Sequence, residues 1–298
     1  MQQSRQNNFY TFVSMAQSEI PLVSIVVPAY NAEDTIIETL ESIAKQSSFA
    51  CTETIIVNDG STDNTVNTVQ DFIADKPSMR LYSKENEGLA ATRNYGFQFV
   101  KGKYLLFLDA DDLIDVDFIS LSLEQFKSNP EIDIVTTEVQ HFERESHIYI
   151  PPTFSAKTIL KINCFVITSL IKSQAFREIG MFDTNLRFHE DWEMWIRMTE
   201  KYNRVAHIDK PLFWYRKRNS QNSLCDLNGI DDIASRAHLY IYNKHFRLFS
   251  SFGFNLRQLF DGLDKATYYQ KKYNGLWYRK LYYRYFGRKS WRDYRKYD

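Results

Sequence analysis

Short apolar runs alternate with longer amphipathic stretches from residue 22 to residue 108. The apolar runs predict strands buried on both faces at residues 22–27, 54–57 and 104–108, with a shorter strand at 80–83. Between them, apolar residues recur at helical spacing. These residues are Ile36, Ile37, Leu40 and Ile43, then Val66, Val69, Phe72 and Ile73, followed by a helical stretch at 89–100. Strands that alternate with helices predict an α/β fold whose mostly parallel central sheet is flanked by helices.

The first predicted helix follows the strand at residues 22–27. Asn31 is a residue type that accepts a hydrogen bond at helix starts, and Asp34 would lie near the positive end of the helix dipole. We therefore expect Asn31 to open and cap this helix.

The alternation of strands and helices weakens after about residue 130. One further strand is predicted at residues 132–135 and one amphipathic helix at 190–200, and the end of the chain has a largely helical pattern. We expect a polar leader at residues 1–20, a main domain at 21–225 and a helical, basic and aromatic C-terminal region at 226–298. In the main domain, residues 21–130 would bind a nucleotide and residues 131–225 would shape the acceptor side.

Composition changes this picture little. The 298 residues carry 37 basic and 37 acidic side chains, 25% charged and 44% hydrophobic residues, which is ordinary for a globular protein and does not indicate a nucleic-acid partner. Three widely spaced cysteines form neither a disulfide framework nor a metal pair. No secretory signal is evident, and no run reaches the ~18 apolar residues of a spanning helix. We expect a cytoplasmic protein.

Polar residues follow three of the predicted strands, at residues 28–31, 58–61 and 109–112. Ligands of parallel α/β sheets bind beyond the carboxyl ends of the strands, so we expect these segments to converge on one crevice.

The acidic loop, defined as residues 109–112, holds three clustered carboxylates: Asp109, Asp111 and Asp112. These groups repel one another unless a cation or hydrogen bonds neutralise them. Hard oxygen ligands suit Mg²⁺ or Mn²⁺, and an ion held by one or two carboxylates leaves positions for substrate phosphates. The alternative is an acidic turn that caps the next helix.

Three other residues each allow two interpretations, a role in binding or catalysis and a purely structural role. Asp59 could accept a base N–H or a ribose hydroxyl, or it could only stabilise its own turn. Tyr30 could stack on a nucleobase or simply pack. Asp191, with its neighbour Glu190, could act as a general base towards an acceptor hydroxyl, or the pair could be the acidic first turn of a helix.

Together, residues 23–31, 57–63, 86–96 and 108–112 resemble glycosyltransferase family 2, and the similarity continues through 179–183 and 190–192. It covers roughly residues 20–218. The resemblance implies a GT-A (Rossmann-like) fold and an inverting hexosyltransferase that moves a sugar, with UDP-sugar as the expected donor, to a hydroxyl of a glycan or lipid-linked glycan. Surface polysaccharide assembly in a bacterium, such as capsule or lipopolysaccharide, is the expected setting.

The resemblance also implies roles for individual residues. Pro28, Tyr30 and Asp59 would contact the uridine side of the donor, Asp109 and Asp111 would be the ribose and metal carboxylates, Arg93 and Asn94 would stabilise the crevice, Asp191 would be the base and Glu190 the weaker candidate for it. The implied cofactor is Mn²⁺ or Mg²⁺.

One position departs from the family's pattern. Two residues past Arg216, where such enzymes often place a histidine, this chain has Arg218. A cation cannot ligate a metal, so we expect Arg218 to neutralise the leaving diphosphate directly.

From residue 265 to the end the chain carries eleven Lys or Arg against two Asp, and residues 268–298 are rich in Tyr and Trp. This tail could pack its aromatic rings on the domain, lie on an anionic membrane surface, or bind nucleic acid. Membrane docking would place the protein at the inner face of the plasma membrane.

The sequence argues against two other functions for the whole chain. A catalytically silent sugar-nucleotide or glycan-binding module would be suspected if Asp111 or Asp191 were missing, and both are present. A nucleotidyltransferase would need a triphosphate-gripping loop rich in Gly, Arg or Lys after the first strand, and residues 28–34 offer none.

Overall fold

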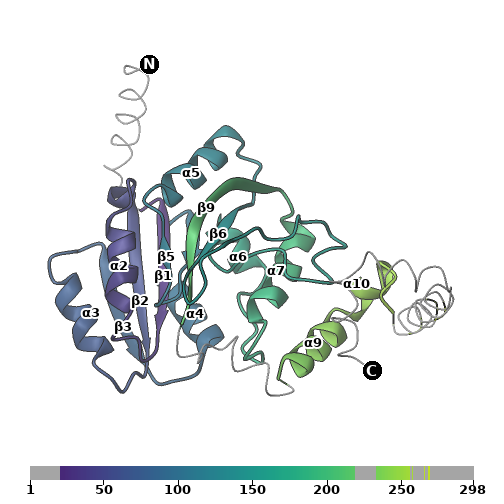
Figure 1. Ribbon diagram of the computed structural model, residues 1–298, viewed down its shortest axis with the longest axis horizontal. Helices are drawn as coiled ribbons and strands as arrows, with labels where there is room; N and C mark the ends of the chain where they lie inside the picture. The colour runs from purple at the N-terminus through teal and green to yellow at the C-terminus, as the bar shows by residue number, and fades with distance from the viewer. Residues whose placement is uncertain (1–20, 219–232, 256, 258–264, 266–267, 269–298) are drawn as a thin grey trace, which may run out of the picture. The chain divides into compact units, whose positions relative to one another are not determined.

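A computed structural model describes residues 21–218, 233–255, 257, 265 and 268 of the chain (Figure 1). By its internal contacts the chain divides into two compact units, Met1–Ile241 and Tyr242–Asp298. The domain boundaries expected from the sequence stay predictions.

The first unit contains all of the strands among the described residues. These strands are β1 (Val23–Ala29), β2 (Thr52–Asp59), β3 (Met79–Lys84), β4 (Tyr104–Phe107), β5 (Leu113–Ile114), β6 (Ile134–Glu143), β7 (Ile148–Tyr149), β8 (Leu170–Lys172) and β9 (Val205–Lys217). Its helices are α2 (Ile36–Ala44), the 3-10 turn η1 (Phe49–Cys51), α3 (Thr65–Ile73), α4 (Leu89–Phe97), α5 (Phe118–Ser128), α6 (Ser173–Glu178), α7 (Glu190–Lys201) and most of α9 (Ile233–Lys244).

The strands form one sheet in the order β3-β2-β1-β4-β8-β6-β9-β5, with β7 paired to the edge of β6 (Figure 1). The ladders β1–β2, β2–β3, β1–β4 and β6–β9 are parallel and carry most of the paired residues. The antiparallel ladders, β4–β8, β6–β8, β5–β9 and β6–β7, each join only two residue pairs. The predicted mostly parallel sheet is confirmed.

Strand β1 is buried on both faces, as its unbroken apolar run predicts. Val23, Ile25 and Val27 share a core with residues of α2 and α3, while Val26 faces the other side, where α4 packs. A Cβ on Gly96 of α4 would lie 2.6 Å from Val26 Cγ1, so only glycine allows this close approach. The contact holds α4, and the polar residues one turn before Gly96, against the sheet.

The helix after β1 starts later than Asn31. It begins at Ile36, and its N-cap residue Thr35 makes no side-chain capping hydrogen bond. Asn31 has a left-handed backbone (φ 47°), and its Oδ1 accepts a hydrogen bond from the Thr62 backbone N–H at 2.8 Å. The prediction that Asn31 caps this helix is wrong, because its side chain joins two neighbouring loops instead.

The strand β9 was not predicted from the sequence. It pairs with β6 over ten residue pairs, and the register shifts around Glu138, which faces Pro211. Proline cannot donate to a ladder and normally argues against a strand, so the pattern of β9 is broken where the ladder itself is irregular. β9 matters to the site because it contains Arg216 and is followed directly by Arg218.

In the second unit, α10 (Phe246–Ser251) places Phe249 in ring contact with Tyr242 and Phe254. The greater part of the predicted helical tail lies outside the described residues. Over the part of the chain that the structure describes, no helix combines the length and the apolar character needed to cross a membrane.

Candidate active site

The loops that follow β1 and β2 are joined by short polar contacts. Beyond the Asn31 bond, the Asn31 N–H donates to Ser61 Oγ at 3.0 Å and the Ala32 N–H donates to Thr65 Oγ1 at 2.8 Å. Two carboxylates reach across as well: Asp63 accepts from Glu33 N–H, and Glu33 accepts from Asn64 N–H. The carboxyl ends of β1 and β2 therefore form one connected edge, as the sequence predicted.

Two of the predicted nucleotide-side residues lie at the end of β1. Pro28 is buried within the strand, opposite Val57 of β2. Tyr30 follows the strand, at the start of the loop after β1, and is 53% exposed. An exposed ring at this edge is open to stacking by a planar ligand.

Asp59 ends β2 and is buried. Its carboxylate accepts hydrogen bonds from Lys84 Nζ (2.8 Å), Glu87 N–H (3.1 Å) and Gly88 N–H (3.0 Å). Burial by itself would raise the pKa of Asp59, but the hydrogen bond from Lys84 and those from the backbone outweigh it, and the pKa is lowered. Asp59 is thus an anion that fixes the loop before α4.

Arg93 of α4 bridges the two halves of the site. Its side chain is 2% exposed; Nη2 lies 2.6 Å from Asp109 Oδ1 and Nη1 lies 2.7 Å from Glu190 Oε1. The guanidinium also stands 5.5 Å from the centre of the Phe182 ring. One buried cation therefore joins the acidic loop after β4 to the start of α7, although Glu190 lies 97 positions after Arg93 in the sequence.

The other two carboxylates of the acidic loop face the end of β9. Asp111 Oδ2 lies 3.0 Å from Arg218 Nε and 2.9 Å from Arg218 Nη2. Asp112 is buried, and its Oδ1 accepts the Arg216 backbone N–H at 2.8 Å. Burial, and then the repulsion from Asp109, raise the pKa of Asp111 despite Arg218. Burial and both neighbouring aspartates raise the pKa of Asp112 further.

Asp191 occupies the first turn of α7, next to Glu190. Its Oδ2 accepts a hydrogen bond from Asn163 Nδ2 at 2.9 Å, and its Oδ1 accepts the Trp192 N–H at 2.7 Å. Burial and the neighbouring Glu190 raise the pKa of Asp191 to about 7, although Arg93 opposes the shift. This carboxyl group changes its charge near neutral pH, as a general base requires.

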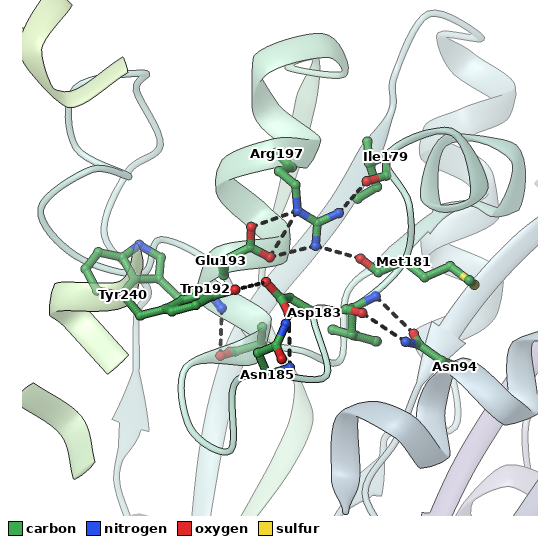
Figure 2. A network of polar contacts seen from close by, with 11 residues as sticks. Asn94, Ile179, Met181, Asp183, Asn185, Trp192, Glu193, Arg197 and Tyr240 are labelled. Atoms are coloured by element: carbon green, nitrogen blue, oxygen red, sulfur yellow. Dashed lines mark hydrogen bonds and ion pairs between the residues drawn. The ribbon is translucent and has the colours of Figure 1, made fainter. Parts of the chain in front are cut away.

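Side chains of α7 and α4 hold the loop before α7 in place through hydrogen bonds (Figure 2). Arg197 of α7 donates to the carbonyl oxygens of Ile179 and Met181 and pairs with buried Glu193 one turn earlier. Asn94 of α4 makes two hydrogen bonds of 2.9 Å with the backbone of Phe182. The predicted residue Asn94 therefore positions this loop, and its contacts run to Phe182 rather than to the acidic loop.

On its other side the same loop meets α9. The Tyr240 hydroxyl donates to Asp183 Oδ2 at 2.8 Å (Figure 2), and His238 of α9 lies against His189 and Trp192. Burial, with a smaller effect of His238, lowers the pKa of His189 to about 4, so this ring is neutral at pH 7.

The structure brings together Arg93, Asp109 and Glu190, pairs Asp111 with Arg218, and places Asp191 beside Glu190. Three residues with direct roles in this arrangement were missed by sequence reasoning: Lys84, Asn163 and Arg216. Lys84 carried a weak signal, because it directly follows the strand predicted at residues 80–83. Asn163 lies in a segment without periodicity, and nothing in the sequence marks it.

The acidic loop fits a hard divalent cation. Its carboxylates are crowded enough to raise the pKa of Asp111 and Asp112, so added positive charge would relieve a repulsion that Arg218 offsets only in part. Asp109 and Asp111 are both about a quarter exposed, so an ion and a substrate phosphate could reach them.

The mostly parallel sheet, the acidic loop after β4 and the arginine that joins this loop to Glu190 of α7 agree with the GT-A fold that the motifs imply. Residues 24–191, more than half of the chain, match the model of Glycosyl transferase family 2. The chain belongs to this family, which confirms the resemblance seen in the motifs.

One relative is chondroitin synthase from Escherichia coli, which is 27% identical over 208 residues, covering 65% of this chain and 30% of the synthase. The matches cover 64% of the glycosyltransferase EpsJ of Bacillus subtilis, 30% of the Escherichia coli chondroitin synthase and 26% of the chondroitin synthase of Pasteurella multocida. The chain therefore spans less than two thirds of the length of each of these relatives.

Two solved structures share the fold. TarS 1–349 from S. aureus in complex with UDP-GlcNAc has a TM-score of 0.57 and 21% identity, covering 80% of this chain and 77% of that one. The mannosyltransferase PcManGT from Pyrobaculum calidifontis in complex with GDP-Man and Mn²⁺ has a TM-score of 0.54 and 15% identity, covering 84% and 81%. At these identities the likeness confirms the GT-A fold alone.

Proposed function

We propose that this protein is an inverting hexosyltransferase that moves a sugar from a UDP-sugar to a hydroxyl of a glycan or lipid-linked glycan in bacterial surface polysaccharide synthesis. The observation that carries the proposal is Asp191, a carboxyl group with a pKa of about 7, joined through Glu190 and Arg93 to Asp109 of the acidic loop. The family supports glycosyl transfer, and the names of a polysaccharide synthase and of a UDP-GlcNAc complex among the matches support polymer and donor.

Asp191 is the base in this proposal. Its carboxylate takes the proton of the acceptor hydroxyl as that oxygen attacks the anomeric carbon and the bond to the diphosphate breaks. A single displacement of this kind inverts the anomeric configuration. Asn163 and the Trp192 N–H each hold one carboxylate oxygen, which fixes its direction, and Glu190 is neutralised by Arg93. Because Glu190 is already paired with Arg93, it is the weaker candidate for the base.

The donor would bind along the edge formed by β1, β2 and β4. Tyr30 offers an exposed ring on which the nucleobase can stack, and Pro28 shapes the end of β1 that precedes it. Asp59, paired with Lys84, keeps the neighbouring loop in place. Asp109 would accept a ribose hydroxyl while Arg93 holds its other side. Asn94 contributes by positioning Phe182 below Arg93.

Asp111, with Asp109, would hold Mn²⁺ or Mg²⁺. When bound, such an ion screens the charge of the leaving diphosphate. The Arg218 guanidinium lies 3.0 Å from Asp111, the carboxylate that would hold the ion, and this closeness supports a role of Arg218 in neutralising the leaving diphosphate. We expect Arg218 to turn from Asp111 to the diphosphate when the donor binds.

The direct test is Asp191→Asn in the full chain. UDP binding in the presence of Mn²⁺, measured by calorimetry, should stay within about twofold, because Asp191 does not touch the donor in this proposal. Release of UDP from a panel of UDP-sugars should fall by about a hundredfold or more. Asp209→Asn, at an exposed position of β9, is the matched control and should change neither quantity. Unchanged UDP release by Asp191→Asn would remove Asp191 as the base.

The basic aromatic tail, residues 268–298, lies outside the described residues except for Tyr268. Its composition supports docking of a cytoplasmic enzyme on the anionic inner face of the plasma membrane. Sedimentation with phosphatidylglycerol vesicles should lose most of its bound fraction when residues 268–298 are deleted. Equal sedimentation of both chains would dismiss membrane docking through this tail.

A further inference from the structure

The hairpin of β6 and β7 gathers two histidines and a carboxylate outside the proposed transfer site: His141 lies in β6, and Glu145 and His147 lie in the turn that follows. The ligand atoms of His141, Glu145 and His147 all lie within 4.8 Å of one another. Glu145 Oε2 is 3.7 Å from His141 Nδ1 and 3.8 Å from His147 Nδ1, and the two imidazole rings are 4.4 Å apart. This set is called the hairpin triad below.

These distances are too long for direct hydrogen bonds and suit a shared ion. A tetrahedral Zn²⁺ with bonds of about 2.0–2.1 Å holds its ligand atoms about 3.4 Å apart. The atoms of the hairpin triad therefore need to move by only a few tenths of an ångström to about one ångström to close around such an ion. Two imidazoles and one carboxylate are a ligand set that zinc accepts, with water at the fourth position.

The imidazole of His141 supplies the second indication. Its Nδ1 atom is buried and makes no hydrogen bond within the described part of the chain. The carboxylate of Glu145 also lies 3.7 Å from Arg144, a long contact that leaves its charge only partly offset.

We propose that the hairpin triad binds one Zn²⁺ ion. A second group among the described residues, Glu138, His207 and Asp209, also gathers three ligand atoms. It has one histidine in place of two, and Asp209 is almost fully exposed. Zinc favours imidazole over exposed carboxylate, so the triad is the site and the second group is its natural control.

The position of the triad gives the ion a structural task. Arg144 lies between Glu143 and Glu145 in the turn, and it donates from its backbone N–H to the Lys217 carbonyl (3.1 Å) and from Nη1 to the Arg218 carbonyl (3.0 Å). An ion that fixes the turn would also fix these two bonds, and with them the backbone that presents Arg218 to Asp111. Zinc binding itself does not depend on the proposed transfer reaction.

The test uses the full chain, stripped of metal with a chelator, and Co²⁺ as a spectroscopic substitute for Zn²⁺. Mg²⁺ in excess occupies the oxygen ligands of the acidic loop, where Co²⁺ would be six-coordinate and weakly absorbing. Co²⁺ in the triad should give the strong visible bands of a four-coordinate ion, and Zn²⁺ should displace it with one equivalent. Competition with a chromophoric chelator then gives the zinc affinity.

His147→Ala is the informative variant, because His147 is about half exposed and its loss does not threaten the core. It should abolish the strong cobalt bands and weaken zinc binding by about a hundredfold or more, since even outer-shell partners are worth 10–100-fold. His207→Ala should retain both. Strong bands that persist in His147→Ala, that vanish in His207→Ala, or that never form in the unaltered chain would each overturn the proposal.

Discussion

Two regions that border the site are held together by different kinds of interaction. The joined loops, defined as residues 30–34 and 60–65, are connected mainly through backbone N–H groups that donate to side-chain oxygens, most of them exposed. The charged centre, defined as Arg93, Asp109, Glu190, Asp111 and Arg218, consists of ion pairs: buried Arg93 pairs with Asp109 and Glu190, and the partly exposed Arg218 pairs with Asp111.

The difference distinguishes the joined loops, which support the site, from the charged centre, whose residues would take part in the reaction. A lost hydrogen bond in an exposed loop is replaced by water, so each contact of the joined loops contributes little and the edge tolerates change. A buried charge has no such substitute, so every member of the charged centre depends on its partner. Beside this centre, burial and then the neighbouring Glu190 raise the pKa of Asp191 to about 7, which no exposed aspartate would reach.

Arg93→Met should have the largest effect. The substitution removes the only side chain that both Asp109 and Glu190 contact in the described ion pairs and leaves two carboxylates facing each other. Breaking a buried pair in this way costs about 3–5 kcal/mol. Urea unfolding at pH 7 should show this loss, and UDP release should be abolished.

The matched control for Arg93→Met is Lys45→Met, which removes an exposed cation whose partner is Glu41 one turn earlier on α2. Exposed pairs of this type contribute about 0.3–0.5 kcal/mol, so the unfolding midpoint should barely move. Similar losses in the two variants would contradict the distinction between the charged centre and an ordinary surface ion pair.

The sequence indicated the members of the charged centre but not their pairing. The positions after β1, β2 and β4 followed from buried runs that end in polar residues, because parallel strands bring their carboxyl ends to one edge. The bridge from Arg93 to Glu190 spans about one hundred positions and depends on how closely α4 packs. Gly96 makes that approach possible, and no local pattern reports it.

In the joined loops a local signal in the sequence is present, but it points to the wrong structure. The sequence predicts a helix cap at Asn31, but caps and loop contacts use the same residue types. The side chain instead accepts the Thr62 N–H from a loop about thirty positions later. Likewise, β9 was missed because Pro211 interrupts its pattern, although its pairing with β6 delivers Arg216 and Arg218 to the acidic loop.

The next effect in size concerns the dependence of stability on pH. Asp191 has a pKa of about 7 in the folded chain and about 4 when unfolded, so the folded state binds its proton more tightly. Stability from this group is present below pH 4 and is lost as the pH rises to about 7. Asp191→Asn cannot lose it, so above pH 7 the variant should be more stable than the parent by about 4 kcal/mol.

Urea midpoints at pH 5 and pH 8 check this expectation, and the gain of Asp191→Asn should grow between the two. Glu190, Arg93 and Asn163 surround the carboxylate and stay unchanged in the variant. In the parent, the rate of UDP release should rise through about pH 7 as the base loses its proton. A gain in stability that is equal at both pH values would show that Asp191 does not titrate in this range.

The smallest effect is expected in the joined loops, at Asn31. Asn31→Ala removes the hydrogen bond to the Thr62 N–H and forces alanine into a left-handed conformation (φ 47°), which costs about 1 kcal/mol. Asn31→Gly removes the same hydrogen bond but adopts that conformation freely, so it should lose less than alanine in urea unfolding. Because water replaces the lost bond at this exposed edge, UDP binding should weaken by less than about tenfold in both variants. A loss at Asn31 as large as that of Arg93→Met would mean that the joined loops are as interdependent as the charged centre.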